Sequence, residues 1–405
     1  MYTQALRFLL PNETYLQDEN MVLPDIYQFL PARTDTDLAD ALTALYRTHC
    51  ASLVDALRYV KEKQFVRLLG SFSGTLTVPV SRLFAHPNLA PWIKMCDWLM
   101  YQQIVRFISH LALQVIPAPV FTMLGNVSNT LTQNITKNFQ HYPDHILQAK
   151  LEPATLFASL LHRLLRVNET AHAASHLLSN DQMRNLMWQD WVKSVRAKRV
   201  VESELPCCGY EEVYRILTTE IRQLLEPLEP SDWYEAGTEY QVDRFSDSGK
   251  PQQANSTDTS SETVINRWAD FLRTLPRRFP QASTRTLLHC ISVIGTATLR
   301  DVTVNQAQSF GCWWITKVWI DEMMHWLAEM GGFLGSTSSV LSDSPHNFET
   351  FDKFLETTHR SSRNSIEPNQ PAGLGIHFQQ SPDYGSVYEE SRARNGPPTA
   401  TCEHS

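Results

Sequence analysis

Apolar residues recur every three or four positions through most of the chain from residue 38 to residue 335, which is the period of an amphipathic α-helix. Aspartate side chains can cap the start of the first helix, and the glycines and proline between 70 and 79 are expected to end it. Later helices are expected over residues 91–111, 120–139, 156–165, 181–198, 210–225, 264–279 and 283–301. Only the segment 74–80 favours a strand, so the pattern predicts an all-α, multi-helix bundle.

The segment 299–330 is expected to form one long helix that carries four of the chain's ten tryptophans. One broad arc of this helix is apolar, and Lys317, Asp321, His325 and Glu329 recur on the opposite arc. The apolar set comprises Trp313, Ile315, Trp319, Ile320, Met323, Trp326, Leu327 and Met330. Such a stripe is either a core helix or a subunit interface, where aromatic and methionine side chains are enriched. The pattern by itself favours the core helix, because most apolar helical stripes face a core.

Composition divides the chain into five parts. Prolines and acids make the first part a poor start for any long element, and two later stretches are too polar to bury enough apolar surface to fold. The parts are a loosely ordered N-terminal arm at 1–37, a helical region at 38–228, an acidic flexible linker at 229–262, a second helical region at 263–335 and a disordered Ser/Pro-rich tail at 336–405.

Charge is unevenly distributed along the chain. The formal net charge is −8, and the linker alone holds eight acids against two bases, so the helical parts are close to neutral. A near-neutral folded part argues against an extended phosphate-binding face. The seven cysteines form no CxxC pair and the N-terminus lacks a signal-peptide pattern, which indicates a reduced, intracellular protein. No apolar run is expected to span a bilayer, so no membrane partner is expected.

Catalytic and ligand-binding signatures are mostly absent from the sequence. In GSFSG at 70–74, Phe72 stands where a nucleophile elbow needs serine, and no glycine-rich phosphate loop occurs. His172 and His176 are one helical turn apart and could hold zinc with His162, but ordinary histidines are the favoured interpretation without further ligands. The adjacent cysteines at 207 and 208 suit neither a metal site nor a disulfide. No catalytic residue, cofactor or metal is therefore expected.

A basic run, KSVRAKR, occupies residues 193–199. Its four bases are Lys193, Arg196, Lys198 and Arg199. They could contact phosphate or serve as a nuclear address. They could equally form the solvated last turn of a helix, where cations complement the helix dipole. The sequence leaves both interpretations open.

Several segments resemble one family of proteins. They are LYRTHCASLVDALRYVKEKQFVRLLGSF at 45–72, APWIKMCDWLMYQQIV at 90–105, IPAPV at 116–120, INRWADFL at 265–272, LRDVTV at 299–304, SFG at 309–311 and WIDEM at 319–323. In this order they resemble the B, C and dimerisation regions of the regulatory factor X (RFX) transcription factors. The resemblance extends roughly from residue 38 to residue 335, and its polar insert and tail are similar to fungal members.

The resemblance implies a non-enzymatic, nuclear, dimer-forming regulator of RNA polymerase II transcription, with 263–335 as the dimerisation region. It favours the interface interpretation of the tryptophan-rich helix. The expected partners are a second copy or another RFX-type factor, together with transcriptional co-regulators. Family members read DNA through a winged-helix domain that precedes these regions, and residues 1–44 do not match it. DNA contact is therefore expected only indirectly, through a missing domain or a partner, whether the chain is a truncated product or a domain-only paralogue.

An alternative from another class is a monomeric helical scaffold that recruits transcriptional co-regulators through its tail. Phe348, Phe351 and Leu355 would share one face of a short helix within 346–358, a spacing that suits docking into an apolar groove.

Overall fold

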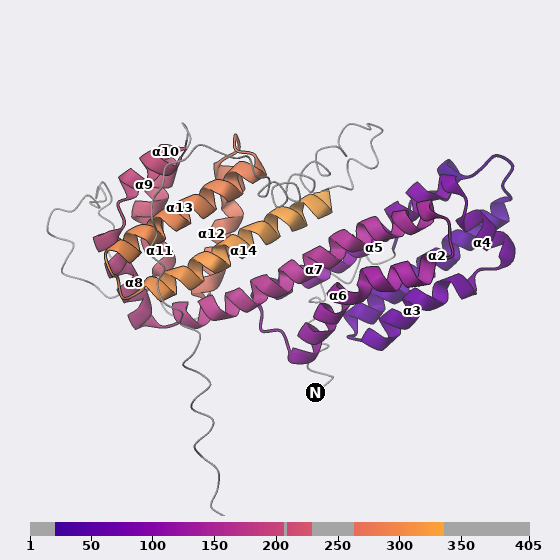
Figure 1. The fold of residues 1–405 in the computed structure, drawn as a ribbon, viewed down its shortest axis with the longest axis horizontal. Coiled ribbons are helices and arrows are strands. Elements are labelled where there is room, and N and C mark those ends of the chain that lie inside the picture. The colour runs from indigo at the N-terminus through magenta and orange to yellow at the C-terminus, as the bar shows by residue number, and fades with distance from the viewer. Residues whose placement is uncertain (1–20, 206–208, 229–262, 336–405) are drawn as a thin grey trace, which may run out of the picture. The chain divides into compact units, whose positions relative to one another are not determined.

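The computed structural model describes residues 21–205, 209–228 and 263–335 (Figure 1). These residues belong to one compact unit. Every regular element in them is a helix, so the predicted all-α fold is confirmed. The predictions for the linker, the tail with its short helix and the adjacent cysteines fall on 229–262, 336–405 and 206–208, which lie outside the described residues.

The first group of helices is organised around α5 and α7. Its elements are η2 (Ile26–Phe29), α2 (Thr36–Arg58), α3 (Glu62–Thr75), α4 (Val78–Phe84), η3 (Pro87–Leu89), α5 (Ala90–Ile108), η4 (Ser109–Leu113), α6 (Ala118–Phe139) and α7 (Asp144–Leu178). Trp92, Ile104 and Val105 of α5 are fully buried, because α2 packs on α5 from one side and α7 from another. A helix that is apolar on more than one face in this way lies inside the core.

The second group contains the shorter helices and the tryptophan-rich helix. Its elements are α8 (Asp181–Ser194), α9 (Ala197–Glu204), α10 (Tyr210–Arg215), the π-helical segment η5 (Ile216–Glu220), α11 (Ile221–Leu225), α12 (Val264–Arg278), α13 (Thr284–Val304) and α14 (Phe310–Gly335). α14 packs against α13, α12 and α8 within this group and against α7 of the first. Figure 1 shows α14 and α7 side by side, so α7 connects both groups.

The described part of the N-terminal arm packs on α5. The indole nitrogen of Trp92 donates a hydrogen bond of 2.9 Å to the carbonyl oxygen of Pro24, and Ile26 is buried. Asp25 caps η2 by accepting from the backbone N–H of Tyr27. The residues before α2 that the structure describes are thus held by a core contact.

Several expected helix boundaries differ from the structure. α3 ends at Thr75, within the expected range of 70–79, although the glycines at 70 and 74 lie inside the helix. In the run that favoured a strand, residues 74–75 end α3 and residues 78–80 start α4, so this run contains no strand. Pro153 lies within the 35-residue α7. An internal proline removes one backbone hydrogen bond, and we attribute its tolerance to the packing of α7 on α5 and α6.

Two further differences are breaks that the pattern missed. Residues 181–198 form two helices, which separate at Val195 and Arg196. The segment 299–330 is also divided, because α13 ends at Val304 and α14 begins at Phe310, with Gln306 between them at a positive φ of 51°. A tight turn of this kind depends on backbone geometry that apolar spacing does not reveal.

α13 is long and apolar enough to cross a membrane by length and composition, and only 28% of its most apolar 18-residue stretch is buried. The expectation that no apolar run would be long enough to span a bilayer is therefore corrected for length and composition, a test that the core helix of a folded protein also passes. In the fold α13 contacts α14, α9 and α8, with Leu299 and Val302 among its buried residues.

Candidate association surface

Both ends of α14 are anchored in the chain's own core. At its start the backbone N–H of Ser309 donates to the carboxylate of Asp190 at 2.8 Å, and Trp313 Nε1 donates to the carbonyl oxygen of Met187. At its end the amide nitrogen of Gln102 donates to the carbonyl oxygen of Phe333 at 2.7 Å. These buried hydrogen bonds to α8 and α5 fix the helix in position and in rotation.

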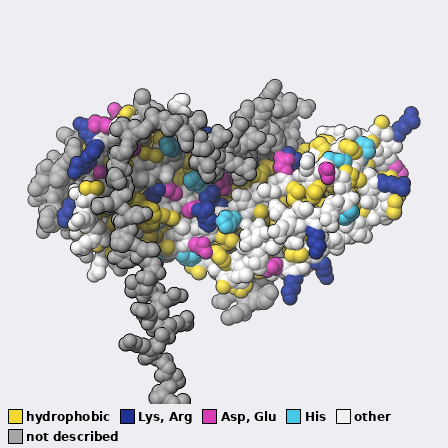
Figure 2. All heavy atoms as spheres, in the orientation of Figure 1, with side chains coloured by type: hydrophobic (Ala, Val, Ile, Leu, Met, Phe, Trp, Pro, Cys, Tyr) yellow, Lys and Arg dark blue, Asp and Glu magenta, His cyan; other side chains and the backbone are white. Residues whose placement is uncertain are grey.

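Ion pairs join the side of α14 to α7. Arg163 contacts Glu322 and Glu329, each at 2.9 Å, and Arg166 also pairs with Glu322. The side-chain hydrogen bonds to Glu329 and then Glu322 raise the pKa of Arg163 against the opposing effect of burial. Figure 2 shows acidic, basic and histidine side chains gathered over α7 and α14. The network is only partly exposed, so it is screened less than a surface pair would be.

The predicted apolar arc of α14 faces the interior of the same chain. Trp313, Trp319, Met323 and Trp326 are buried. Ile315, Ile320, Leu327 and Met330 are half-buried and pack against the core. The arc therefore supplies core packing in this structure, as its apolar pattern alone favoured. Whether it also meets a partner stays a prediction.

A different aromatic pair of α14 points outward. Trp314 is 51% exposed and Phe310 is 38% exposed, and their rings stack with centroids 6.3 Å apart. Val304, at the end of α13, is 74% exposed. We call Val304, Phe310 and Trp314 the outer patch. Exposed tryptophan is a frequent anchor of protein interfaces.

Sequence reasoning missed Trp314, although a signal for it was present. Consecutive residues on a helix point about 100° apart, since one turn takes 3.6 residues. Trp313 and Trp314 therefore differ in direction, and burial of the first helps to turn the second outward. Asp321 and His325 of the predicted polar arc follow Trp314 at helical spacing, which places them on the same side of the helix, and both are half-buried.

The basic run is exposed, but it does not close one helix. Lys193 lies in the last turn of α8, while Lys198 and Arg199 lie in the first turn of α9, and all four bases including Arg196 are exposed. Cations at a helix start oppose the helix dipole, so the proposed dipole role holds only for Lys193. Phosphate contact or a nuclear address stays a prediction.

The rejected chemical motifs lie on α7 and α3. His162, His172 and His176 are exposed on α7, and within the described ranges no cluster of metal-ligating side chains is found. Ser71 and Phe72 belong to α3, with Phe72 buried.

Comparison with known proteins decides the family. The family model described as RFX BCD domain matches residues 42–331. This chain belongs to the RFX family. It is 33% identical to Protein sak1 of Schizosaccharomyces pombe over 85% of this chain and 45% of that protein. It is 30% identical to the Transcriptional regulator RFX1 of Candida albicans over 80% of this chain and 36% of that protein.

More distant RFX relatives extend to animals. The human DNA-binding protein RFX2 is 25% identical over 76% of this chain and 42% of its own length. The chain thus spans less than half the length of these curated relatives. No solved structure matches the chain.

Proposed function

We propose that the chain is a non-enzymatic association module of a nuclear transcription regulator, which pairs with a second RFX-type chain through the outer patch. Membership of the RFX family supports the regulatory part, since relatives are named for transcription regulation or DNA binding. The second chain is another copy or a different RFX-type factor. DNA recognition is supplied by a region outside the described helices or by the partner.

The observation that carries the proposal is the exposed ring pair of Trp314 and Phe310 on a helix anchored at both ends. An anchored helix loses little conformational freedom on binding, so the free energy of covering the two rings is retained as affinity. The buried tryptophans of α14 are already used inside the chain. Half-buried members of the predicted set, such as Ile315 and Met330, still have surface for a partner to cover.

The test is the mass of the whole chain in solution, measured by sedimentation velocity at micromolar concentration. We expect twice the 46.3 kDa of one chain for the wild type. Trp314→Asp should give a monomer with unchanged helical circular dichroism, because a charge at the centre of the patch cannot be covered without desolvation. Val115→Asp is the matched control, since Val115 is 70% exposed elsewhere and should leave the dimer intact.

The possible outcomes separate the two parts of the proposal. A wild-type monomer at these concentrations would contradict the pairing itself. A dimer that persists in Trp314→Asp would contradict the outer patch as the interface while leaving the pairing in place. Unfolding of Trp314→Asp would show that the ring has a structural role its exposure does not suggest.

A further inference from the structure

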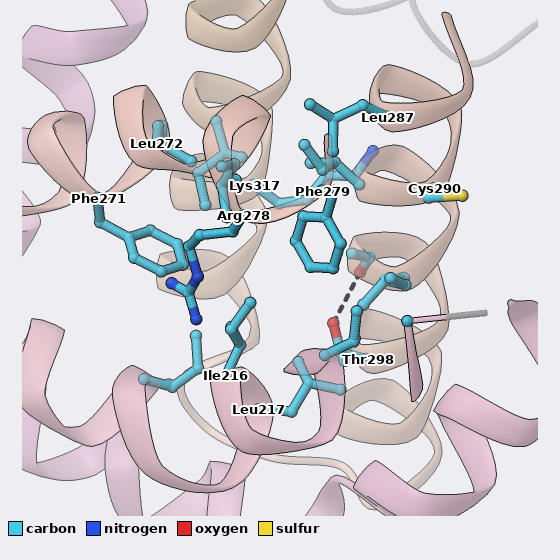
Figure 3. Close-up of a pocket in the computed structure, with 18 of the residues that line it drawn as sticks. Ile216, Leu217, Phe271, Leu272, Arg278, Phe279, Leu287, Cys290, Thr298 and Lys317 are labelled. Carbon is cyan, nitrogen blue, oxygen red and sulfur yellow. Dashed lines mark hydrogen bonds between the residues drawn. The ribbon is translucent and has the colours of Figure 1, made fainter. Parts of the chain in front are cut away.

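A cavity of about 350 Å³ lies within the second helical group (Figure 3). Phe271 and Phe279 come from α12 and its end, Leu287 and Ile291 come from α13, and the π-helical segment η5 contributes Ile216 and Leu217. In Figure 3 Phe271 and Phe279 lie to the left and right of Arg278, and Ile216 and Leu217 lie below them. The lining also includes Trp191 and Trp313, which are buried.

The charged side chains at this cavity are neutralised within the chain. Arg278 donates to Glu220 at 2.6 and 2.8 Å and to Glu212 at 2.6 Å. Lys317 donates to Asp321 at 2.5 Å. A charged ligand would have to compete with these pairs or enter an apolar space without a counter-ion, which costs free energy. The charge distribution therefore selects an uncharged occupant.

Neutral polar groups in the wall are mostly satisfied as well. The indole N–H groups of Trp191 and Trp313 donate to the backbone carbonyls of Leu217 and Met187, at 3.0 and 3.1 Å. Thr298 donates to a carbonyl in its own helix. The indole N–H of Trp268 has no hydrogen-bond partner among the described residues, but this nitrogen is buried. Recognition at this site would thus rest on apolar contacts.

The π-helical segment at the cavity is the local irregularity that shapes it. η5 interrupts an otherwise α-helical run between α10 and α11, and its residues Ile216 and Leu217 line the cavity. π-helical turns are uncommon and occur frequently at functional sites. Glu220, in the same segment, holds Arg278 in place.

We propose that this cavity binds one uncharged, lipophilic small molecule. Its volume lies within the range of about 300 to 1,000 Å³ that is usual for small-molecule sites, and such sites are mainly apolar and aromatic in lining. Two buried tryptophans, Trp191 and Trp313, belong to this apolar and aromatic lining. The site is separate from the outer patch and does not depend on pairing.

The uncharged lipophilic dye Nile red tests the proposal on the whole chain. We expect saturable fluorescence enhancement with one site per chain. Ile291→Trp fills the cavity and should weaken dye binding at least tenfold. Thr296→Trp adds the same ring on the same helix at an exposed position that does not line the cavity, and should bind dye as the wild type does.

Cys290 gives a second measurement that needs no variant. It lines the cavity and is half-buried, whereas Cys50, Cys96 and Cys312 are buried. Labelling by an uncharged maleimide, followed by mass spectrometry of the peptide that carries Cys290, should slow when Nile red is bound. Non-saturable binding, unchanged affinity in Ile291→Trp or unprotected Cys290 would each overturn the proposal. If dye binding per chain decreased as the protein concentration rose, a second chain would be the occupant of the cavity, and this result would also overturn the proposal.

Discussion

Tyr46, Asp97 and Lys150 form a hydrogen-bonded cluster inside the first helical group. Tyr46 donates to Asp97 at 2.6 Å, and Lys150 donates to both Asp97 and Tyr46 at 2.8 Å. Burial, followed by the charge of Asp97, raises the pKa of Tyr46 well above its usual value, so its hydroxyl stays protonated. The cluster joins α2, α5 and α7. Because Asp97 and Lys150 pair with each other, the cluster specifies the arrangement of these helices without leaving an isolated buried charge.

His49 lies beside this cluster and stays uncharged. Burial, and then the positive charge of Lys150, lowers the pKa of His49 to about 3. Its ring packs on Phe72 with centroids 4.4 Å apart. A histidine in the unfolded chain titrates near 6.5, so below that pH the unfolded state binds a proton that the folded state does not.

Stability should therefore fall as the pH is lowered from about 6.5 towards 3. The contribution of His49 is about 1.4 kcal/mol per pH unit in this window. We expect His49→Phe to reduce the pH slope of the free energy of unfolding by nearly that amount, measured by urea unfolding at pH 6, 5 and 4. His176→Phe, at an exposed position, should keep the wild-type slope. Equal slopes in all three proteins would contradict the assignment to His49.

At the scale of elements, apolar spacing predicted helices well and their ends poorly. α6, α12 and α13 lie close to the expected ranges, because proline, polar stretches or capping serine mark their boundaries. Residues of α2 and α3 were expected to form one continuous helix, yet the two helices separate around Val60, which has a positive φ of 56°. Apolar periodicity continues across such a turn, so spacing alone does not detect it.

The tryptophan-rich helix allows a direct comparison of core and surface positions. Trp326 is 1% exposed and Trp314 is 51% exposed on the same helix. We expect Trp326→Ala to lower the free energy of unfolding by about 3 to 5 kcal/mol, the usual cost of emptying a core aromatic site. Trp314→Ala should change it by no more than about 0.5 kcal/mol. Urea unfolding at a protein concentration low enough to keep the chain monomeric measures both changes. Equal losses of unfolding free energy in the two variants would contradict the finding that Trp326 is buried and Trp314 is exposed.

At the scale of the whole molecule, the two helical regions expected from composition depend on each other. The predicted boundary after residue 228 separates α11 from α12 along the chain, but α14 crosses back to the first region. Arg163 pairs with Glu322, Gln102 donates to Phe333, and Trp98 stacks on Phe333 with centroids 4.8 Å apart. The second region therefore completes the core of the first.

The segment 263–335 should accordingly fail to fold by itself. Isolated, it would expose the buried arc of α14 and leave Glu322 without its arginine partners on α7. We expect low helical circular dichroism and no cooperative urea transition for this fragment, while residues 21–335 retain both. A cooperative, monomeric fragment would show that the region is an independent domain. A fragment that folds only as a dimer would indicate that the arc can pair with a second copy.

The sequence by itself determined the all-α class, most helix positions and, through ordered resemblance, the RFX family. These follow from local periodicity and from residues that keep their order along the chain. Tertiary structure alone decided which face of α14 is covered, because an apolar arc looks the same whether its own chain or a partner buries it. Tertiary structure also formed the cavity between α12, α13 and η5 and paired Lys150 with Asp97, since both depend on residues far apart in sequence.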